Sequence, residues 1–354
     1  MQDDYQMELN RRRFLMGSVA TLAAGIMSSG WIADAAAAGF PSKNIRVYVP
    51  TRQGGGADRN LRLVTTLWKD ILKINFEPAF YPGAAGRVAY ETYMGKASGD
   101  GHDLIFGNMG PEVLNWVVKK PTFPLDAYRY FFRVDEDPSM IFVGKRSKLK
   151  TIDDIVAEGK KRTVNFATSR IAHPATIGVL ALGKATGASF NPIPLSGGRN
   201  TRNGVATGEI DFGALPAGGM VVQRKNFKML LLFADKNVLG EKAHNAPTVN
   251  DKYGTKLPPL VSARAFGIKT EVIEKYPDRM KVLEDTLRQV VALDAFKKAV
   301  IKAKAPWELI SPGGQKECAE YVKSIVAIGN EYRDLLRGAE AKAKAKKKKG
   351  KKKS

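Results

Sequence analysis

The stretch Ile45-Arg46-Val47-Tyr48-Val49, continued by Pro50-Thr51-Arg52-Gln53-Gly54-Gly55-Gly56-Ala57-Asp58, decides the fold prediction. The β-branched and aromatic residues of its first part predict a short strand, and apolar residues at helical spacing predict a helix over 59–72. A glycine turn between a strand and a helix leaves backbone N–H groups unpaired at the positive end of the helix dipole. The stretch is therefore suited to bind an anion, although an ordinary strand-to-helix turn has the same pattern.

The same unit recurs along the first half of the chain. A strand is predicted over 74–80, the turn Tyr81-Pro82-Gly83-Ala84-Ala85-Gly86 follows it, and a helix is predicted over 87–96. The turn 99–101 then leads into a strand over 103–107. Successive units of this kind favour a parallel sheet with helices on its faces. Ligands of such sheets bind beyond the carboxyl ends of the strands, where both glycine turns would lie.

A second set of strand–helix units occupies the second half. Met140–Val143, within 128–144, predicts a strand that crosses between two parts of the molecule, and Thr151 with Asp154 predicts a helix N-cap. We therefore predict an α/β fold of two lobes, with the chain crossing between them twice. The further strands are expected over 164–167, 190–195, 208–214, 229–233 and 265–268, and the further helices over 176–186, from 199 to about 207, 276–293 and 313–337.

Composition narrows the function classes. The chain has 354 residues, a single cysteine (Cys318) and three histidines at no ligand-like spacing, so a disulfide within the chain is impossible and a zinc site is not expected. The glycine run lacks the Gly-x-Gly-x-x-Gly and Gly-Lys-Ser/Thr patterns of nucleotide-binding loops. No Ser/His/Asp or Cys/His order is convincing, and a Gly-x-Ser-x-Gly elbow is absent. We expect no catalytic residue, no metal and no cofactor, and hence a protein that is not an enzyme.

The formal net charge of +22 is unevenly distributed. Residues 1–38 contribute −1 and residues 338–354 contribute +8, which leaves +15 for residues 39–337. A basic body suits anionic small ligands, nucleic acid or an anionic membrane surface, and charge alone does not choose among them.

The two ends of the chain have their own patterns. Asn10-Arg11-Arg12-Arg13-Phe14-Leu15 and the mildly apolar stretch after it resemble a twin-arginine export signal, and Ala35–Ala38 offers a cleavage site. The alternative is an uncleaved membrane anchor, for which the glycines and serines of this stretch are poorly suited. Residues 1–38 are thus interpreted as a signal peptide that places the mature chain in the periplasm. Residues 338–354 form a lysine-rich tail that we expect to be disordered.

Six motifs in order resemble one family, the Bug-type periplasmic solute receptors of tripartite tricarboxylate transporters. They comprise Pro50–Asp58, Pro82–Gly86, Asp100–Asn108, Val164–Ser169, Pro194–Gly198 and Gly208–Phe212, with Ala246–Val249 further on. The resemblance extends over about residues 39–335. It implies a type II periplasmic-binding-protein fold with a ligand in the cleft between its lobes. Lobe 1 would comprise 39–145 plus 264–337, and lobe 2 would comprise 146–263.

The resemblance also implies which residues bind the ligand. In such receptors two glycine turns of the first lobe hold a carboxylate, and loops of the second lobe close over it. Carried over, this gives Arg52, Gln53, Gly54, Gly55, Gly56, Ala57, Asp58, Gly83, Ala84, Ala85, Gly86 and Asn108 in lobe 1, and Thr168, Ser169, Arg170, His173, Ser196, Gly197, Gly198 and Arg199 in lobe 2.

Three arginines depart from the family pattern: Arg52, Arg170 and Arg199. One hypothesis is that at least one of them pairs with a ligand carboxylate, and the alternative is that they lie on solvated loop rims. His173 would either make binding depend on pH or pack as a helix cap. For Asp58 we favour a structural role, accepting a backbone N–H of its own loop.

We therefore predict a periplasmic solute-binding protein that captures a small organic carboxylate, mono- or dicarboxylate, between two lobes. Its partners would be membrane permease subunits or a sensor kinase, and no specific nucleic acid is expected. The alternative is an interaction protein whose basic tail contacts an anionic membrane or polymer.

Overall fold

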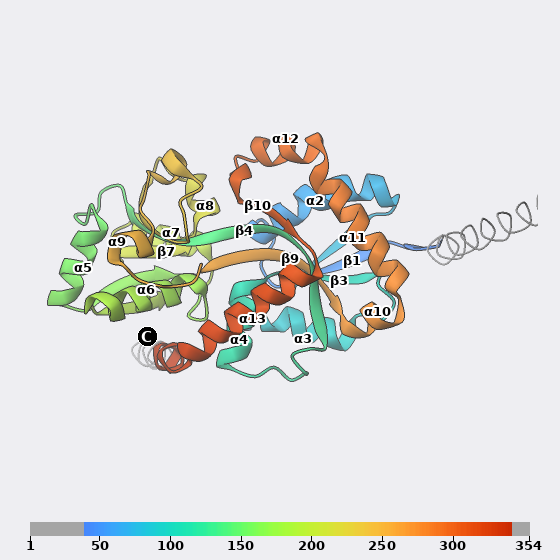
Figure 1. Cartoon of the computed structure of the whole chain (residues 1–354), viewed down its shortest axis with the longest axis horizontal. Coiled ribbons are helices and arrows are strands. Elements are labelled where there is room, and N and C mark those ends of the chain that lie inside the picture. The colour runs from blue at the N-terminus through green and yellow to red at the C-terminus, as the bar shows by residue number, and fades with distance from the viewer. Residues whose placement is uncertain (1–38, 342–354) are drawn as a thin grey trace, which may run out of the picture.

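The computed structural model describes residues 39–341, and both the predicted signal peptide and residues 342–354 of the lysine-rich tail lie outside this range. The described chain forms two groups of strands and helices joined by two long strands, β4 and β9 (Figure 1). The strand order is β2-β1-β3-β9-β4-β7-β5-β6, with β8 and β10 also paired to β4. This is the mixed α/β architecture that the sequence predicts.

The first lobe has a parallel sheet at its N-terminal side. β1 (Ile45–Val49) lies between β2 (Phe76–Phe80) and β3 (Asp103–Asn108), with Val47 opposite Pro78 and Leu104. All three strands end at the same edge, because parallel strands point the same way. The loops after β1, β2 and β3 therefore gather there, as the sequence predicts.

The second lobe repeats this arrangement. β5 (Val164–Thr168) lies between β6 (Phe190–Pro194) and β7 (Phe212–Pro216), and both neighbours are parallel to it. β8 (Phe227–Phe233) pairs antiparallel with β4. The loops after β5, β6 and β7 consequently share one edge of the second sheet.

The two lobes share strands. β4 (Tyr128–Gly144) pairs over Tyr128–Pro138 with β9 (Val261–Lys269), and over Ser139–Gly144 with β7 and β8. β9 also pairs with β3, and the short strand β10 (Ile310–Gly313) pairs with β4. The chain therefore passes between the lobes twice, once within β4 and once on entering β9, as predicted. The proposed lobe limits near residues 145 and 263 remain a prediction.

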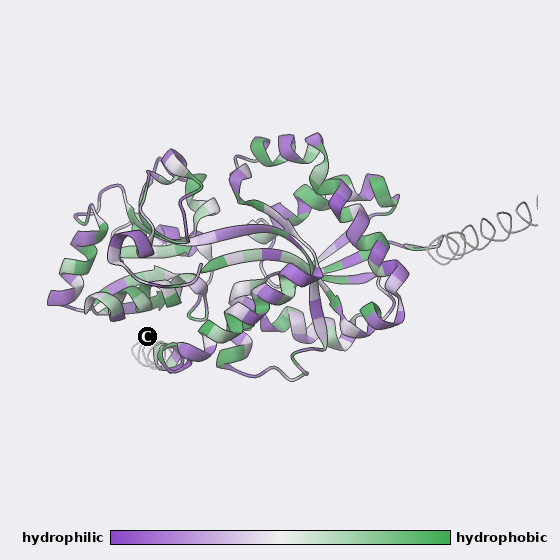
Figure 2. Cartoon of the chain, viewed as in Figure 1, coloured by the Kyte–Doolittle hydropathy of each residue, from purple (hydrophilic) through white to green (hydrophobic). Residues whose placement is uncertain are grey.

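Helices cover both sheets, and their polar and apolar residues alternate along the ribbon as in amphipathic helices (Figure 2). The first lobe carries α2 (Gly56–Leu72), η1 (Ala84–Gly86), α3 (Arg87–Lys96), α4 (Met109–Val118), α10 (Thr270–Lys275), α11 (Pro277–Ala292), α12 (Asp294–Lys302), η3 (Trp307–Leu309) and α13 (Gln315–Glu331). The second carries α5 (Ile152–Lys161), α6 (Pro174–Thr186), α7 (Gly198–Ala206), α8 (Ala217–Val221), η2 (Gly240–Ala243) and α9 (Val249–Tyr253). No helix of the described chain is long and apolar enough to span a bilayer.

Local sequence signals account for many element limits. Thr151 caps α5 in a capping box with Asp154, and Gly187 ends α6 in the left-handed conformation, both as predicted. β1 and α3 have the predicted limits, whereas α4, α8, α9, α10, α12 and β10 were not predicted. Beyond α13, residues 333–341 are helical, so helix reaches into the first residues of the 338–354 segment.

A buried ion-pair network lies where β4 and β9 pass between the lobes. Arg264 of β9 pairs with Asp135 and, at 3.0 Å, with Asp137, both on β4. Asn60 of α2 donates to Asp135 at 2.7 Å, and the backbone N–H of Gly218 in α8 donates to Asp137 at 2.7 Å. Burial alone would lower the pKa of Arg264, but the two carboxylates reverse this effect and raise it. We call these residues the hinge network; it connects a helix of each lobe to the shared strands.

Replacing Asp135 by alanine should destabilise the fold by about 3 kcal/mol or more, because it leaves part of the buried Arg264 charge unpaired. Urea denaturation at pH 7 measures this loss. Asp285→Ala is the matched control, since Asp285 forms an exposed pair with Lys281 and its removal should hardly move the midpoint. Equal midpoints for the two variants would show that the hinge network does not carry this energy.

Candidate ligand-binding site between the lobes

The loop between β1 and α2 is held by its own aspartate. The N–H of Gly54 donates to Asp58 Oδ2 at 2.7 Å, and Arg62 Nε donates to Asp58 Oδ1 at 2.7 Å. Gly54 has φ +76°, a conformation that favours glycine. Asp58 as a residue is 3% exposed, and its carboxylate fixes the loop, which is the structural role favoured from the sequence.

The start of α2 leaves backbone donors open. Its N-cap, Gly55, offers no side-chain acceptor. Within residues 39–341, the N–H groups of Gly56, Ala57 and Asp58 have no hydrogen-bond acceptor. Arg52 and Gln53, just before them, are exposed to solvent. The loop therefore has the open helix start that an anion cradle requires.

The second glycine turn is shaped by close packing. Gly83 has φ +140° and Gly86 has φ +103°, with Ala84 and Ala85 also at positive φ between them. A Cβ on Gly86 would lie 3.1 Å from Glu112 Oε1 and 3.4 Å from Arg170 Nη1. Glycine at position 86 is required by its backbone angle and by this approach.

Arg170 links the two lobes. It lies in the loop between β5 and α6, and its Nη1 donates to the carbonyl of Ala85 at 2.6 Å and to Glu112 Oε1 at 3.1 Å. Glu112, in the first turn of α4, is 1% exposed; burial raises its pKa, and the Arg170 charge opposes that shift. Glu112 Oε2 and Asn108 Oδ1 are buried and, in the described structure, have no partner. Arg170, one of the three arginines expected at the cleft, therefore binds residues of the first lobe in this structure.

Other second-lobe residues of the predicted site hold their loops together. Thr168 Oγ1 lies 2.9 Å from Thr176 Oγ1, and the Ser169 carbonyl accepts the Gly197 N–H at 3.3 Å. His173 is the N-cap of α6 and accepts the Ala175 N–H at Nδ1, 3.0 Å away. Burial, with the charges of Arg170 and Arg264, lowers the pKa of His173 to about 3. His173 is therefore neutral near pH 7.

The start of α7 faces the cleft from the second lobe. Ser196 (φ +55°) and Gly197 (φ +119°) turn the chain into Gly198, and the helix has no side-chain cap. Arg199 is exposed, whereas Arg202 is half-buried. Burial lowers the pKa of Arg202, and the charges of Arg59 and Arg199 add to that shift.

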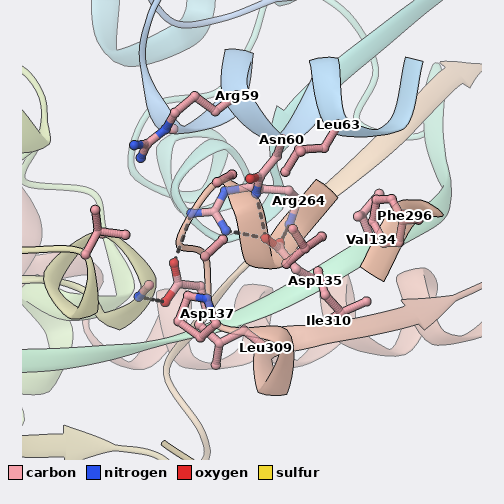
Figure 3. Close-up of a pocket in the computed structure, with 18 residues that line it drawn as sticks. Arg59, Asn60, Leu63, Val134, Asp135, Asp137, Arg264, Phe296, Leu309 and Ile310 are labelled. Atoms are coloured by element: carbon pink, nitrogen blue, oxygen red, sulfur yellow. Dashed lines mark hydrogen bonds and ion pairs between the residues drawn. The ribbon is translucent and has the colours of Figure 1, made fainter. Parts of the chain in front are cut away.

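A narrow cavity lies between the lobes beside the hinge network (Figure 3). Of the twenty predicted ligand-binding residues, Gly56 alone lines it in the described structure. Figure 3 shows the Arg59 side chain extending from α2 away from the paired Arg264, with Leu63 further along the same helix. The hinge network was missed because its residues pair across long distances in the sequence, and Arg59 and Arg202 were not included because only the folded chain brings α2, α7 and α8 together. The lining residues are Gly56, Arg59, Asn60, Leu63, Val134, Asp135, Asp137, Gly218, Gly219, Val222, Arg264, Phe296, Val300, Ala303, Ala305, Pro306, Leu309 and Ile310.

Within residues 39–341, no group of three or more His, Cys, Asp or Glu side chains is arranged to hold a metal ion. Cys318 is buried, and burial raises the pKa of its thiol to about 12, which leaves it unreactive near neutral pH.

Two α/β lobes joined by two crossings, with a cavity at their junction, define the type II periplasmic-binding-protein fold. The sequence matches no protein-family model and no curated protein. Solved structures share the fold, however, and they include solute-binding proteins of the TctC and Bug type, as the sequence motifs suggested.

Three of these structures illustrate the similarity. Rpa4515 of R. palustris with adipate has 16% identity and a TM-score of 0.72, covering 84% of this chain and 98% of its own. The periplasmic binding protein BugD has 16% identity and a TM-score of 0.70, covering 84% and 98%. MatC of Rhodopseudomonas palustris with bound malate has 19% identity and a TM-score of 0.65, covering 85% and 99%. At these identities the likeness shows the fold.

Replacing Arg170 by alanine should cost about 3–5 kcal/mol of unfolding free energy, because Glu112 would remain buried without its partner. The double variant Arg170→Ala with Glu112→Gln should recover much of that loss, since no charge is then stranded. Urea denaturation of the single and double variants measures both. A double variant as unstable as Arg170→Ala would contradict this account.

His173 should make stability fall as the medium is acidified. Its pKa is about 3 in the folded chain and 6.5 ordinarily, so between these values the unfolded state binds more protons. Its stabilising contribution is complete above pH 6.5 and should fall by roughly 2–3 kcal/mol at pH 4.5.

The variant His173→Asn keeps an acceptor for the helix start but does not titrate in this range. Urea denaturation at pH 7 and pH 4.5 should therefore show a smaller pH effect in the variant than in the wild type. Parallel pH dependence in the two proteins would refute the assignment.

Proposed function

We propose that this chain is a periplasmic solute-binding protein that captures an organic carboxylate between its two lobes and delivers it to a tripartite tricarboxylate-type permease. The observation that carries the proposal is the cavity between two lobes of this fold, bordered by the uncapped start of α2 and by Arg59. Arg202 of the second lobe lies next to its lining residue Gly219. Support comes from the similar folds of Rpa4515 with adipate and MatC with bound malate. The twin-arginine signal and a sensor kinase as an alternative partner belong to the same proposal.

Binding would begin on the first lobe. A carboxylate at the start of α2 would accept hydrogen bonds from the open N–H groups of Gly56, Ala57 and Asp58, at the positive end of a helix of 17 residues. Gly54 and Asp58 hold this loop before the ligand arrives, so little ordering entropy is lost on binding. The loops after β5 and β6 would then close over the ligand from the second lobe.

His173 and Asp58 would support the site without contacting the ligand. His173 accepts a hydrogen bond from the start of α6, and the two Asp58 oxygens accept hydrogen bonds from Gly54 and Arg62. Near neutral pH, His173 stays uncharged. Carboxylate affinity should therefore vary little between pH 6.5 and pH 8.

Gly56→Asp tests the site at the start of α2. A Cβ at position 56 meets no atom within 4 Å, and an acidic side chain suits the first turn of a helix, so the fold should be retained. The new carboxylate would repel the ligand and weaken binding at least about tenfold. Calorimetric titration of residues 39–354 with a panel of mono-, di- and tricarboxylates measures the effect.

Gly95→Asp is the matched control, because it adds the same charge at an open position near the C-terminal end of a different helix, α3. It should bind as the wild type does. Undiminished binding by Gly56→Asp would exclude the start of α2 as the carboxylate site. Absence of binding to every acid of the panel would exclude the proposed function.

A further inference from the structure

Arg59 and Arg202 lie beside the cleft on opposite lobes, with Arg199 near Arg202, and none of the three has an acidic partner in the described structure. Arg59 lies in the first turns of α2, and Arg199 and Arg202 lie in the first turns of α7. Among residues 39–341, none of their guanidinium groups forms an ion pair or a side-chain hydrogen bond. By contrast, Arg62, one turn after Arg59, is paired with Asp58. The cluster, which we call the cleft arginines, is therefore a concentration of uncompensated positive charge.

Two of the cleft arginines, Arg59 and Arg202, approach one cavity from opposite lobes. Arg59 lines the cavity together with Gly219 of α8. Arg202 Nη1 lies 3.7 Å from the position that a Cβ on Gly219 would occupy, and 3.4 Å from that of Gly198. Burial lowers the pKa of Arg202, and the positive charges of Arg59 and Arg199 lower it further, as expected for cations that repel one another. Closure of the lobes therefore brings like charges together unless an anion lies between them.

The spacing along α2 relates this cluster to the proposed carboxylate site. Arg59 follows Gly56 by three residues, which places it about one helical turn, roughly 5 Å, along the axis. A ligand bound at the start of α2 would thus have a second cationic position within reach of a short carbon chain. Guanidinium groups suit this position, because they bind carboxylates through paired N–H donors.

We propose that the solute is a di- or tricarboxylate whose second carboxylate is held by Arg59, Arg199 and Arg202. This inference rests on the proposed function and specifies its substrate class. The second carboxylate neutralises repulsion that otherwise opposes closure, so a ligand with two charges stabilises the closed form more than one with a single charge. The cleft arginines therefore select for ligand charge as well as ligand length.

The test is a calorimetric titration of acids matched in chain length. Succinate, glutarate and adipate are compared with butyrate, valerate and hexanoate, using residues 39–354 as wild type, Arg59→Gln and Arg202→Gln. The wild type should bind at least one diacid about tenfold or more tightly than its matched monoacid. Each variant should lose about 10- to 100-fold in affinity for that diacid and less than about threefold for the monoacid.

Arg129→Gln is the matched control, since Arg129 is an exposed arginine of β4 without an ion pair in the described structure. It should behave as the wild type does. Arg202→Gln should also unfold at a temperature no lower than the wild type, because it removes repulsion. If Arg202 instead stabilised the fold, its replacement would lower the unfolding temperature.

The outcomes separate the two proposals. If monoacids bind as tightly as matched diacids, or if both variants weaken the two classes equally, the role of the cleft arginines is overturned while carboxylate binding stands. If no acid of either class binds to the wild type, the proposed function itself fails, and the substrate class fails with it.

Discussion

The two-lobe arrangement depends on the contact of Arg264 with Asp135 and Asp137 in the hinge network. Charged groups removed from water gain little net stability from pairing, so their main effect here is geometric. The same two carboxylates accept Asn60 from α2 and Gly218 from α8, so helices of both lobes are fixed to one point on the shared strands. A change in the angle between the lobes must therefore be accommodated by strand ends and loops outside this cluster.

Around that fixed point, charges across the cleft have opposite effects. Arg170 attracts the first lobe through Glu112 and the Ala85 carbonyl, which favours closure. Arg59 and Arg202 repel each other, which opposes closure. The attraction is little screened because Glu112 is buried, whereas the repulsion is screened more, because Arg59 is exposed and Arg202 is half-buried. The cleft is thus subject to attraction on one side and repulsion on the other, a condition in which a bound anion has a large influence on the closed population.

The sequence predicted those parts of the fold that local interactions determine. β1, α3, the start of α5 and the end of α6 follow from β-branched runs, helical periodicity, the Thr151 cap and Gly187. α4 was missed because Gly110 and Pro111 resemble a turn, although proline is well accommodated in the first turn of a helix. The strand limits of β4 were missed because its 17 residues are held by partners far along the chain, from β7 to β10. The residue pattern of the β4 segment alone gives no information about which distant strands pair with it.

The candidate site was predictable to a similar extent. The glycine turns follow from sequence, since their backbone conformations require glycine, but the partners of each arginine are set by packing. One local signal does separate them: Arg62 has Asp58 four residues before it and is paired, whereas Arg59 has Gly55 and Arg202 has Gly198 at that distance. Glycine-rich helix starts expose backbone N–H groups and also exclude the acids that would neutralise arginines one turn later. The same residues that open an anion cradle thus leave the neighbouring guanidinium groups without a partner in their own helix.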